Sequence, residues 1–407
     1  MTLTNTRNSY GGVAKTLHWL TALMILTLLL LGWIADQAAE RATAGGAGGE
    51  EIARAAWLFS AHKTLGIALF GVALLRILWA LTQKRPGLLN ADHRAEALAA
   101  ETVHWLLYGA LVLVPLSGWI HHAATEGFAP IWWPFGQSLP MVPKSAALAD
   151  LTAVLHRAFL LVLLGALALH VAGALKHHLI DRDATLRRML PGRSDLPTPP
   201  KQAHSVAPLL LALMIWLGAL GAGSWVNSQS TPHAPSGLQS AALEAVASDW
   251  QVTEGTLAIT VTQLGSAVSG SFADWTAAIQ YDPRETPGPA GEVTVTIAIP
   301  SLALGSVTAQ AMGSDFFDAA QFPTADFTAT LHRTETSHEA RGMLSLRGAS
   351  VPVTLPFDLE LDGDTARMRG TVTLDRRDFG IGANMPDESS LKFPVTVTVA
   401  LEAMRAP

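Results

Sequence analysis

The sequence predicts a multidomain protein in which an all-α transmembrane helical bundle is followed by an all-β antiparallel barrel. Three observations support this prediction. Only 15% of the 407 residues are charged and the mean hydropathy is +0.30, whereas soluble domains carry about 25% charged residues. Five apolar stretches in the first half come close to the roughly 20 residues that cross a bilayer. From residue 249 onward, apolar residues recur at every second position.

The predicted spans are residues 17–35, 57–81, 103–121, 152–175 and 206–226. Tryptophans lie near the ends of these stretches, as in the aromatic belt of a membrane interface. The first stretch lacks a small-residue cleavage site and is followed by further spans. We therefore expect it to be a retained helix and not a signal peptide.

Loop charge predicts how the spans are oriented. The loops on the side of the N-terminus carry 11 Lys and Arg residues, and the loops on the other side carry three. This bias places the N-terminus in the cytoplasm by the positive-inside rule. An odd number of spans then places everything after residue 226 outside. We therefore expect a multi-pass protein of the bacterial inner membrane with a periplasmic C-terminal barrel.

Composition excludes several kinds of chemistry. The chain has no cysteine, which excludes disulfides, thiolate zinc sites, cysteine-held iron–sulfur clusters and covalently attached haem. Residues 1–226 carry a net charge of +5 and residues 227–407 one of −11, and no basic stripe suggests a nucleic-acid partner. Any metal chemistry must therefore use histidine, methionine or carboxylates.

Five of the 14 histidines lie inside or at the ends of four predicted spans: His18, His62, His104, His156 and His170. Ionisable side chains within a span are costly and usually functional. His18 and His170 lie at the inner level of the membrane, and His62 and His156 lie at the outer level. Because His156 and His170 are 14 residues apart, they share one face of their helix and lie about 21 Å apart along it.

This arrangement predicts two bis-histidine haem groups stacked across the bilayer. Iron with two imidazole ligands has no open position, which favours electron transfer. A proton relay or a zinc path could also use membrane histidines, but no acidic residue lies within the first four predicted spans. His104 is either a further ligand or a residue that hydrogen-bonds or contacts the haem edge.

Three cations accompany the proposed ligands. Arg76 lies 14 residues after His62 and shares its helix face at the inner level, where a haem propionate could pair with it. Snorkelling to the interface is the alternative for Arg76. Lys63 and Arg157 each follow an outer ligand directly, and they could pair with propionates or attract an anionic substrate.

The same segments resemble a known family. KTLHWL at 15–20, HKTLGIALFGVALLRILW at 62–79, HWLLYGALVLVPLSGW at 104–119, LHRAFLLVLLGALALHVAGALKHH at 155–178 and DRDATLRRMLP at 181–191 resemble the bacterial cytochrome b561 family. The resemblance covers about residues 8–192. It implies a four-helix di-haem b protein that exchanges electrons with quinone, with superoxide-to-quinone transfer in some members. It also implies that His18 and His170 bind the inner haem and that His62 and His156 bind the outer one. The fifth span and the C-terminal domain depart from the family pattern.

The C-terminal region contains eight or nine alternating segments, such as EVTVTIAI at 292–299, with Gly, Asp and Pro turns between them. This pattern predicts a closed antiparallel barrel. GSDFFDAAQFPTADFTATL at 313–331 and GTVTLDRRDFGIG at 370–382 resemble the YceI-like, polyisoprenoid-binding family over about residues 249–403, although the opening strand fits less well. The resemblance implies a lipocalin-like fold whose apolar interior takes an isoprenoid tail.

Aromatic side chains are candidates for the lining of that interior, although each could equally fill a core: Phe316, Phe317, Phe322, Phe327 and Phe379. An eight-stranded barrel is just wide enough for one slender ligand. The isolated His332 and His338 are interpreted as surface residues, and the region shows no nucleophile–base pair or metal cluster. The barrel is therefore predicted to bind a ligand and not to be an enzyme.

The predicted domains are a cytochrome-like domain at 1–192, an inner loop and fifth transmembrane helix at 193–226, a linker at 227–248 and the barrel at 249–407. The leading hypothesis is a quinone-linked membrane oxidoreductase with two haem b groups. Electrons would pass between ubiquinone or a related isoprenoid quinone and an outer-side partner or superoxide, while the barrel binds an isoprenoid or quinone tail. Two alternatives stay open. One is an isoprenoid or quinone carrier or sensor with a haem-containing membrane anchor, and the other is the b-type anchor subunit of a separate dehydrogenase.

Overall fold

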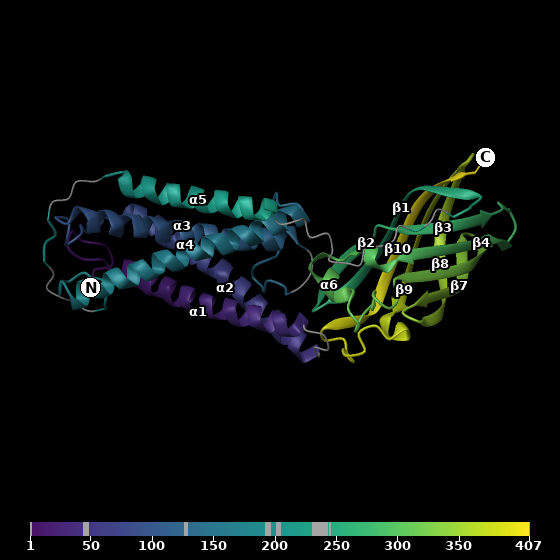
Figure 1. Ribbon diagram of the computed structural model, residues 1–407, viewed down its shortest axis with the longest axis horizontal. Coiled ribbons are helices and arrows are strands. Elements are labelled where there is room, and N and C mark those ends of the chain that lie inside the picture. Colours follow the sequence, from purple (N-terminus) through teal and green to yellow (C-terminus); the bar gives the residue numbers. More distant parts are fainter. Residues whose placement is uncertain are drawn as a thin grey trace. The chain divides into compact units, whose positions relative to one another are not determined.

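The computed structural model describes residues 2–43, 49–125, 129–191, 197–200, 205–229, 243 and 246–406. The chain divides into two compact units. One is built around a bundle of long helices and the other around a β-sheet (Figure 1). Most of the linker predicted at 227–248 lies outside the described residues.

Five helices in the described part of the chain are long and apolar enough to cross a membrane, which confirms the predicted spans. The first four extend past the predicted spans at both ends. The second helix, for example, begins with Glu50 and Glu51 in its first turn, where carboxylates interact favourably with the helix dipole. The helices are α1 (Gly12–Thr43), α2 (Gly49–Thr82), α3 (Arg94–Ala124), α4 (Ala146–Leu179) and α5 (Ala207–Gln229).

One hydrophobic core joins residues from all five helices, which run alongside one another (Figure 1). α5 packs against α4 through Trp216, whose ring meets Phe159 edge-on with 5.5 Å between ring centroids. Gly109 of α3 permits this approach, because a Cβ there would overlap the Trp216 indole. The fifth helix is therefore an integral part of the bundle.

The C-terminal unit contains one antiparallel sheet, with ten strands among the described residues in the order β3-β4-β6-β7-β8-β9-β10-β1-β2-β5. The first strand pairs along nearly its whole length with the last. The strands are β1 (Trp250–Gln263), β2 (Ser266–Phe272), β3 (Trp275–Tyr281), β4 (Gly288–Ala298), β5 (Leu302–Ala303), β6 (Thr324–Arg333), β7 (His338–Leu346), β8 (Ala349–Asp362), β9 (Thr365–Asp375) and β10 (Leu391–Arg405).

The sheet curls (Figure 1), so that its β3 edge returns to the start of β1, where Asp249 N donates to Ile279 O at 3.0 Å. β3 and β5 are the end strands, and the ladder of described strands does not close between them. The predicted antiparallel fold class is confirmed, with ten strands instead of eight or nine and a curled sheet instead of a fully closed ladder. We refer to this curled sheet as the barrel.

Short elements between β4 and β6 pack into one end of the barrel. They are η1 (Ile299–Ser301), η2 (Gly305–Val307) and α6 (Thr308–Ala311). Ile299, Val307 and Ala311 are buried in the same hydrophobic cluster as Leu257 and Ile259 of β1. This end of the barrel is therefore closed by apolar side chains.

His338 is only 4% exposed, so its interpretation as a surface residue is wrong. Its ring stacks on Phe357 of β8 with 5.3 Å between ring centroids, and its Nε2 lies 3.0 Å from the hydroxyl of Tyr281. The register of β7 against β8 places this strand-end histidine on the inward face, and a single isolated histidine in the sequence does not reveal that register.

Candidate functional site

The histidines that were predicted to lie at the inner level, called the inner histidines below, converge from three helices of the bundle. His18 of α1 and His170 of α4 have ring centroids 6.1 Å apart, and His104 of α3 lies 5.2 Å from His170. Arg76 of α2 reaches the same place, with its Nη2 3.3 Å from His18 Nδ1. The structure thus brings four of the predicted residues together.

This histidine cluster does not have the geometry of a small metal site. Among the described residues, the one group of three or more ligand-type side chains whose atoms all lie within 4.8 Å of one another is Glu96, His177 and Asp181. Lys176 Nζ forms ion pairs with two members of that group, at 2.7 Å from Glu96 and 3.0 Å from Asp181. We interpret that second group as an ion-pair network.

The separation of His18 and His170 suits a larger group between them. Two imidazoles that bind one metal from opposite sides, at metal–nitrogen distances of about 2 Å, have ring centres roughly 6 Å apart. The observed 6.1 Å agrees with that value. His104 contacts His170 edge-on, at an interplanar angle of 72°, and so stands beside this pair.

The outer histidines lie on α2 and α4. His156 Nδ1 is 2.9 Å from Val114 O, and because a carbonyl only accepts, Nδ1 must carry the proton. Nε2 then keeps its lone pair, which is the tautomer that a metal ligand requires. His62 Nδ1 is buried without a hydrogen-bond partner.

Two glycines make room for the outer imidazoles. A Cβ at Gly32 of α1 would lie 2.9 Å from His62 Cε1, and a Cβ at Gly118 of α3 would lie 3.2 Å from the His156 ring. Contacts this short would force the rings to move. Both positions therefore require glycine for the present placement of the two histidines.

The predicted cations occupy different environments. Lys63 is buried at 8% exposure, whereas Arg157 is exposed. The Arg76 guanidinium also lies over the Tyr108 ring, 5.6 Å from its centroid. Arg76 is therefore held among the inner histidines and does not reach away from them to the interface.

The described part of the bundle buries two cations that were not predicted as site residues, Arg188 and Lys15. Arg188 follows α4 and is 4% exposed. It donates to Asn8 O at 2.8 Å and to Gly87 O at 2.7 Å, and its Nη2 has no partner. Its segment also meets α1, where Lys15 Nζ donates to Leu190 O at 2.8 Å. In the sequence Arg188 is one of several arginines in a charged tail, and only the fold shows which of them is buried.

The barrel encloses an apolar cavity of about 280 Å³. Phe316, Phe317, Phe327 and Phe379 are among its lining residues. Phe322 is not, because its ring lies against Gly348. The polar side chains of the lining are few: Gln263, Tyr281, Gln310 and Arg376.

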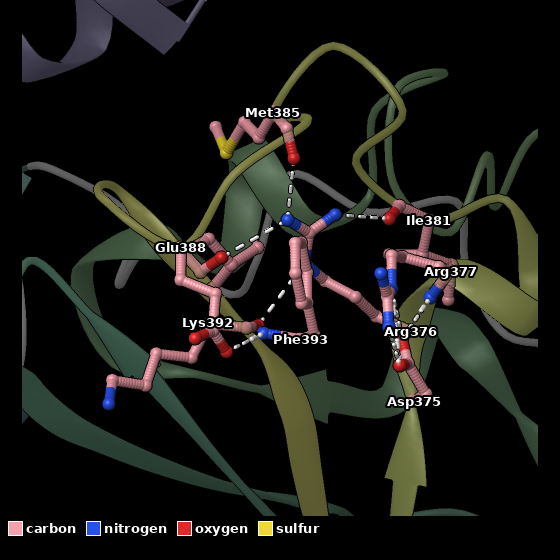
Figure 2. A network of polar contacts seen from close by, with 9 residues as sticks. Asp375, Arg376, Arg377, Ile381, Met385, Glu388, Lys392 and Phe393 are labelled. Atoms are coloured by element: carbon pink, nitrogen blue, oxygen red, sulfur yellow. Dashed lines mark hydrogen bonds and ion pairs between the residues drawn. The ribbon is translucent and has the colours of Figure 1, made fainter.

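Arg376 organises the loop that follows β9 (Figure 2). It is 3% exposed, and burial lowers the pKa of its guanidinium. Each of its five N–H groups donates to a backbone carbonyl. The acceptors are Lys392 O (3.2 Å), Ile381 O (2.8 Å), Gly382 O (2.8 Å), Met385 O (2.7 Å) and Leu391 O (3.1 Å). This arginine is therefore saturated and has a structural role at the end of the cavity.

A bundle with histidines at two levels of the membrane, joined to an apolar β-barrel, defines a membrane protein that can hold metal-bearing groups between its helices. Comparison with known families matches residues 9–192 to prokaryotic cytochrome b561 and residues 249–403 to the YceI-like domain. The chain belongs to the prokaryotic cytochrome b561 family and carries a YceI-like domain after it.

Three relatives illustrate the match. Cytochrome b561 homolog 2 of Escherichia coli is 32% identical over 200 residues, which cover 47% of this chain and 95% of the relative. The probable superoxide oxidase CybB of Yersinia pestis is 26% identical over 183 residues, 45% of this chain and 96% of the relative. A UPF0312 protein of Pseudomonas syringae pv. tomato is 27% identical over 147 residues, 33% of this chain and 76% of the relative.

Solved structures similar to this chain include BcnA of Burkholderia cenocepacia, with 24% identity and a TM-score of 0.36 over 38% of this chain and all of that one. The Campylobacter jejuni YCEI protein has 20% identity and a TM-score of 0.30 over 34% of this chain and 85% of its own.

Membership of the cytochrome b561 family implies haem, and the histidine sites fit such a group. At the inner level the evidence is the ring separation of His18 and His170. At the outer level it is the tautomer of His156, the orphaned Nδ1 of His62 and the glycines beside both rings. All of these donors are imidazole nitrogens, as bis-imidazole ligation of haem iron requires.

Proposed function

We propose that this chain is a di-haem b membrane cytochrome that passes electrons between a quinone and a partner on the outer side. The observation that carries the proposal is on α4. His156 and His170 are 14 residues apart on that helix, and His170 faces His18 of α1 with 6.1 Å between ring centroids. His18 and His170 would hold the inner haem, and His62 and His156 the outer one.

Bound haem would supply a one-electron redox centre whose two axial positions are filled. The residues around it orient the ligands and balance charge. Val114 O fixes the His156 tautomer. Arg76, beside His18, and the buried Arg188 offer positive charge to propionates at the inner level. Lys63 is the corresponding buried cation next to His62, and the exposed Arg157 could attract an anionic donor.

Superoxide is a candidate donor for the outer haem. The proposal follows from the similarity to a relative named as a probable superoxide oxidase and from the positive charge next to both outer ligands. With the N-terminus in the cytoplasm, as loop charge predicts, the outer haem and the barrel would both face the periplasm.

The barrel, in this proposal, holds the tail of an isoprenoid or a quinone. The supporting observation is a cavity of about 280 Å³ whose lining is almost wholly apolar. The cavity also favours a second candidate function, in which the chain is an isoprenoid carrier and the haems are structural. Rapid reduction of the haems by a quinol in membranes would exclude that second candidate.

Haem spectra test the ligand assignment. We expect the purified chain to show a reduced-minus-oxidised b-type spectrum with two haems per chain, and His156→Ala and His170→Ala each to lose one. His178→Ala, an exposed histidine on the same helix, is the matched control and should keep both. If both ligand variants retain two haems, the assignment is wrong.

A further inference from the structure

Gln263 interrupts the apolar lining of the barrel. Leu257, Ile259, Val261 and Gln263 are alternate residues of β1 and all line the cavity, as the period of a strand requires. Gln263 is the last of the series and is 7% exposed. The strand therefore points one buried primary amide into an apolar space.

This amide has no partner in the described protein. Its Oε1 is buried without a hydrogen bond, and no described side chain or backbone group pairs with its Nε2. A buried polar group without a hydrogen bond is strongly unfavourable. Leucine would extend the alternating apolar series of β1 at this position without that cost.

The Leu391 carbonyl and the Arg376 guanidinium, both at this end of the barrel, already have partners. Gln263 pairs across the ladder with Leu391, whose carbonyl accepts from Arg376 Nη2 at 3.1 Å. All five N–H groups of Arg376 donate to backbone carbonyls, several of which are drawn in Figure 2.

We infer that Gln263 recognises the oxygen of an isoprenoid headgroup, a hydroxyl or a carbonyl, at the Arg376 end of the cavity. The amide can accept from a hydroxyl through Oε1 and donate to either kind of oxygen through Nε2. The apolar tail then follows the cavity toward Trp250, which lines it at the other end of β1. The inference rests on the proposed isoprenoid binding by the barrel and adds that the ligand carries oxygen.

A matched pair of probes tests this selectivity. The full-length chain in phosphatidylcholine nanodiscs is titrated with farnesol and, separately, with farnesene, which has the same carbon skeleton without the oxygen. Dissociation constants are compared for Gln263→Leu and for Gln251→Leu, a control at an exposed position of the same strand. Partition of the probes into the bilayer is the same in both samples, so a difference between the variants reports on the barrel.

We expect the control to prefer farnesol by about tenfold, the equivalent of one hydrogen bond to a buried group, and Gln263→Leu to lose that preference. We also expect Gln263→Leu to raise the unfolding temperature of the ligand-free chain, because it removes an unpaired amide. An unchanged preference in Gln263→Leu, or a lowered unfolding temperature, overturns the inference alone. Absence of binding of either probe to any of the chains refutes isoprenoid binding by the barrel, and the inference with it.

Discussion

Replacing Arg376 by methionine should destabilise the barrel more than any other single change of a charged residue in it. The guanidinium is 3% exposed and bonds five backbone carbonyls, four of them in the segment from Ile381 to Leu391 (Figure 2). Methionine keeps much of the apolar contact of the arginine stem but supplies no donor. The five carbonyls would then compete for water that the fold excludes.

The size of the effect follows from the number of lost bonds. Hydrogen bonds from charged donors contribute about 1.5–3 kcal/mol each, and their losses are not additive. We expect the free energy of unfolding to fall by about 4 kcal/mol or more, which few single mutations reach. For a domain the size of residues 249–403, this corresponds to a fall of roughly 8–16 °C in the unfolding temperature.

The neighbouring arginine is a matched control. The Arg377 side chain is 57% exposed, and its Nη2 pairs with Asp375 Oδ2 at 2.6 Å on the surface. Arg377→Met should therefore change the unfolding temperature little. Thermal unfolding of the full-length chain, followed by near-ultraviolet circular dichroism, compares the two variants. Similar small shifts for both would refute the structural role of the Arg376 network.

Three other predictions follow from buried groups. A Cβ at Gly32 would lie 2.9 Å from the His62 ring, so Gly32→Leu should displace that ring and lower the haem content. Gly66 has open space at the position of its Cβ, so the control Gly66→Leu should keep the haem content unchanged. Arg188→Met should lower the free energy of unfolding by about 2 kcal/mol, because it breaks the hydrogen bonds to Asn8 O and Gly87 O. The measurement is the unfolding temperature, with the exposed Arg187→Met as the control. Equal effects of the two substitutions would contradict this prediction. Burial and the nearby Arg333 lower the pKa of His338, so the unfolded chain binds the proton more readily than the folded one. The barrel should therefore lose stability as pH falls below about 6.5. His338→Gln should flatten that pH dependence, and an unchanged slope would refute its origin in His338.

The features that the sequence predicted correctly depend on residues close together in the chain. Spans are recognised by runs of apolar residues and strands by alternation, and both patterns are local. The 14-residue spacing of His156 and His170 places them on one helix face by helical geometry alone. The contact of Arg76 with His18 agrees with the helix level at which Arg76 was predicted to lie.

The features that were missed depend on register and on long-range contacts. His338 was interpreted as exposed because nothing next to it in the sequence shows which face of β7 it occupies. Phe322 resembles the other aromatic candidates, yet it packs on Gly348 outside the cavity lining. Gln263 continues an inward series of β1, but one polar residue at the end of a strand is not distinctive in the sequence.

The sequence alone determined that this chain has five membrane-spanning helices, an antiparallel β domain and histidines at two levels of one helix, because repeat period and helix geometry follow from local covalent structure. Only the tertiary structure decided which polar groups are buried and which of them have partners. Arg188, Arg376 and Gln263 are all buried, yet Arg376 is saturated by carbonyls while Arg188 and Gln263 keep unpaired atoms. The difference arises because the hydrogen-bond partners of a buried group come from segments that are far apart in the sequence. A local sequence pattern therefore does not show whether such a group has a partner.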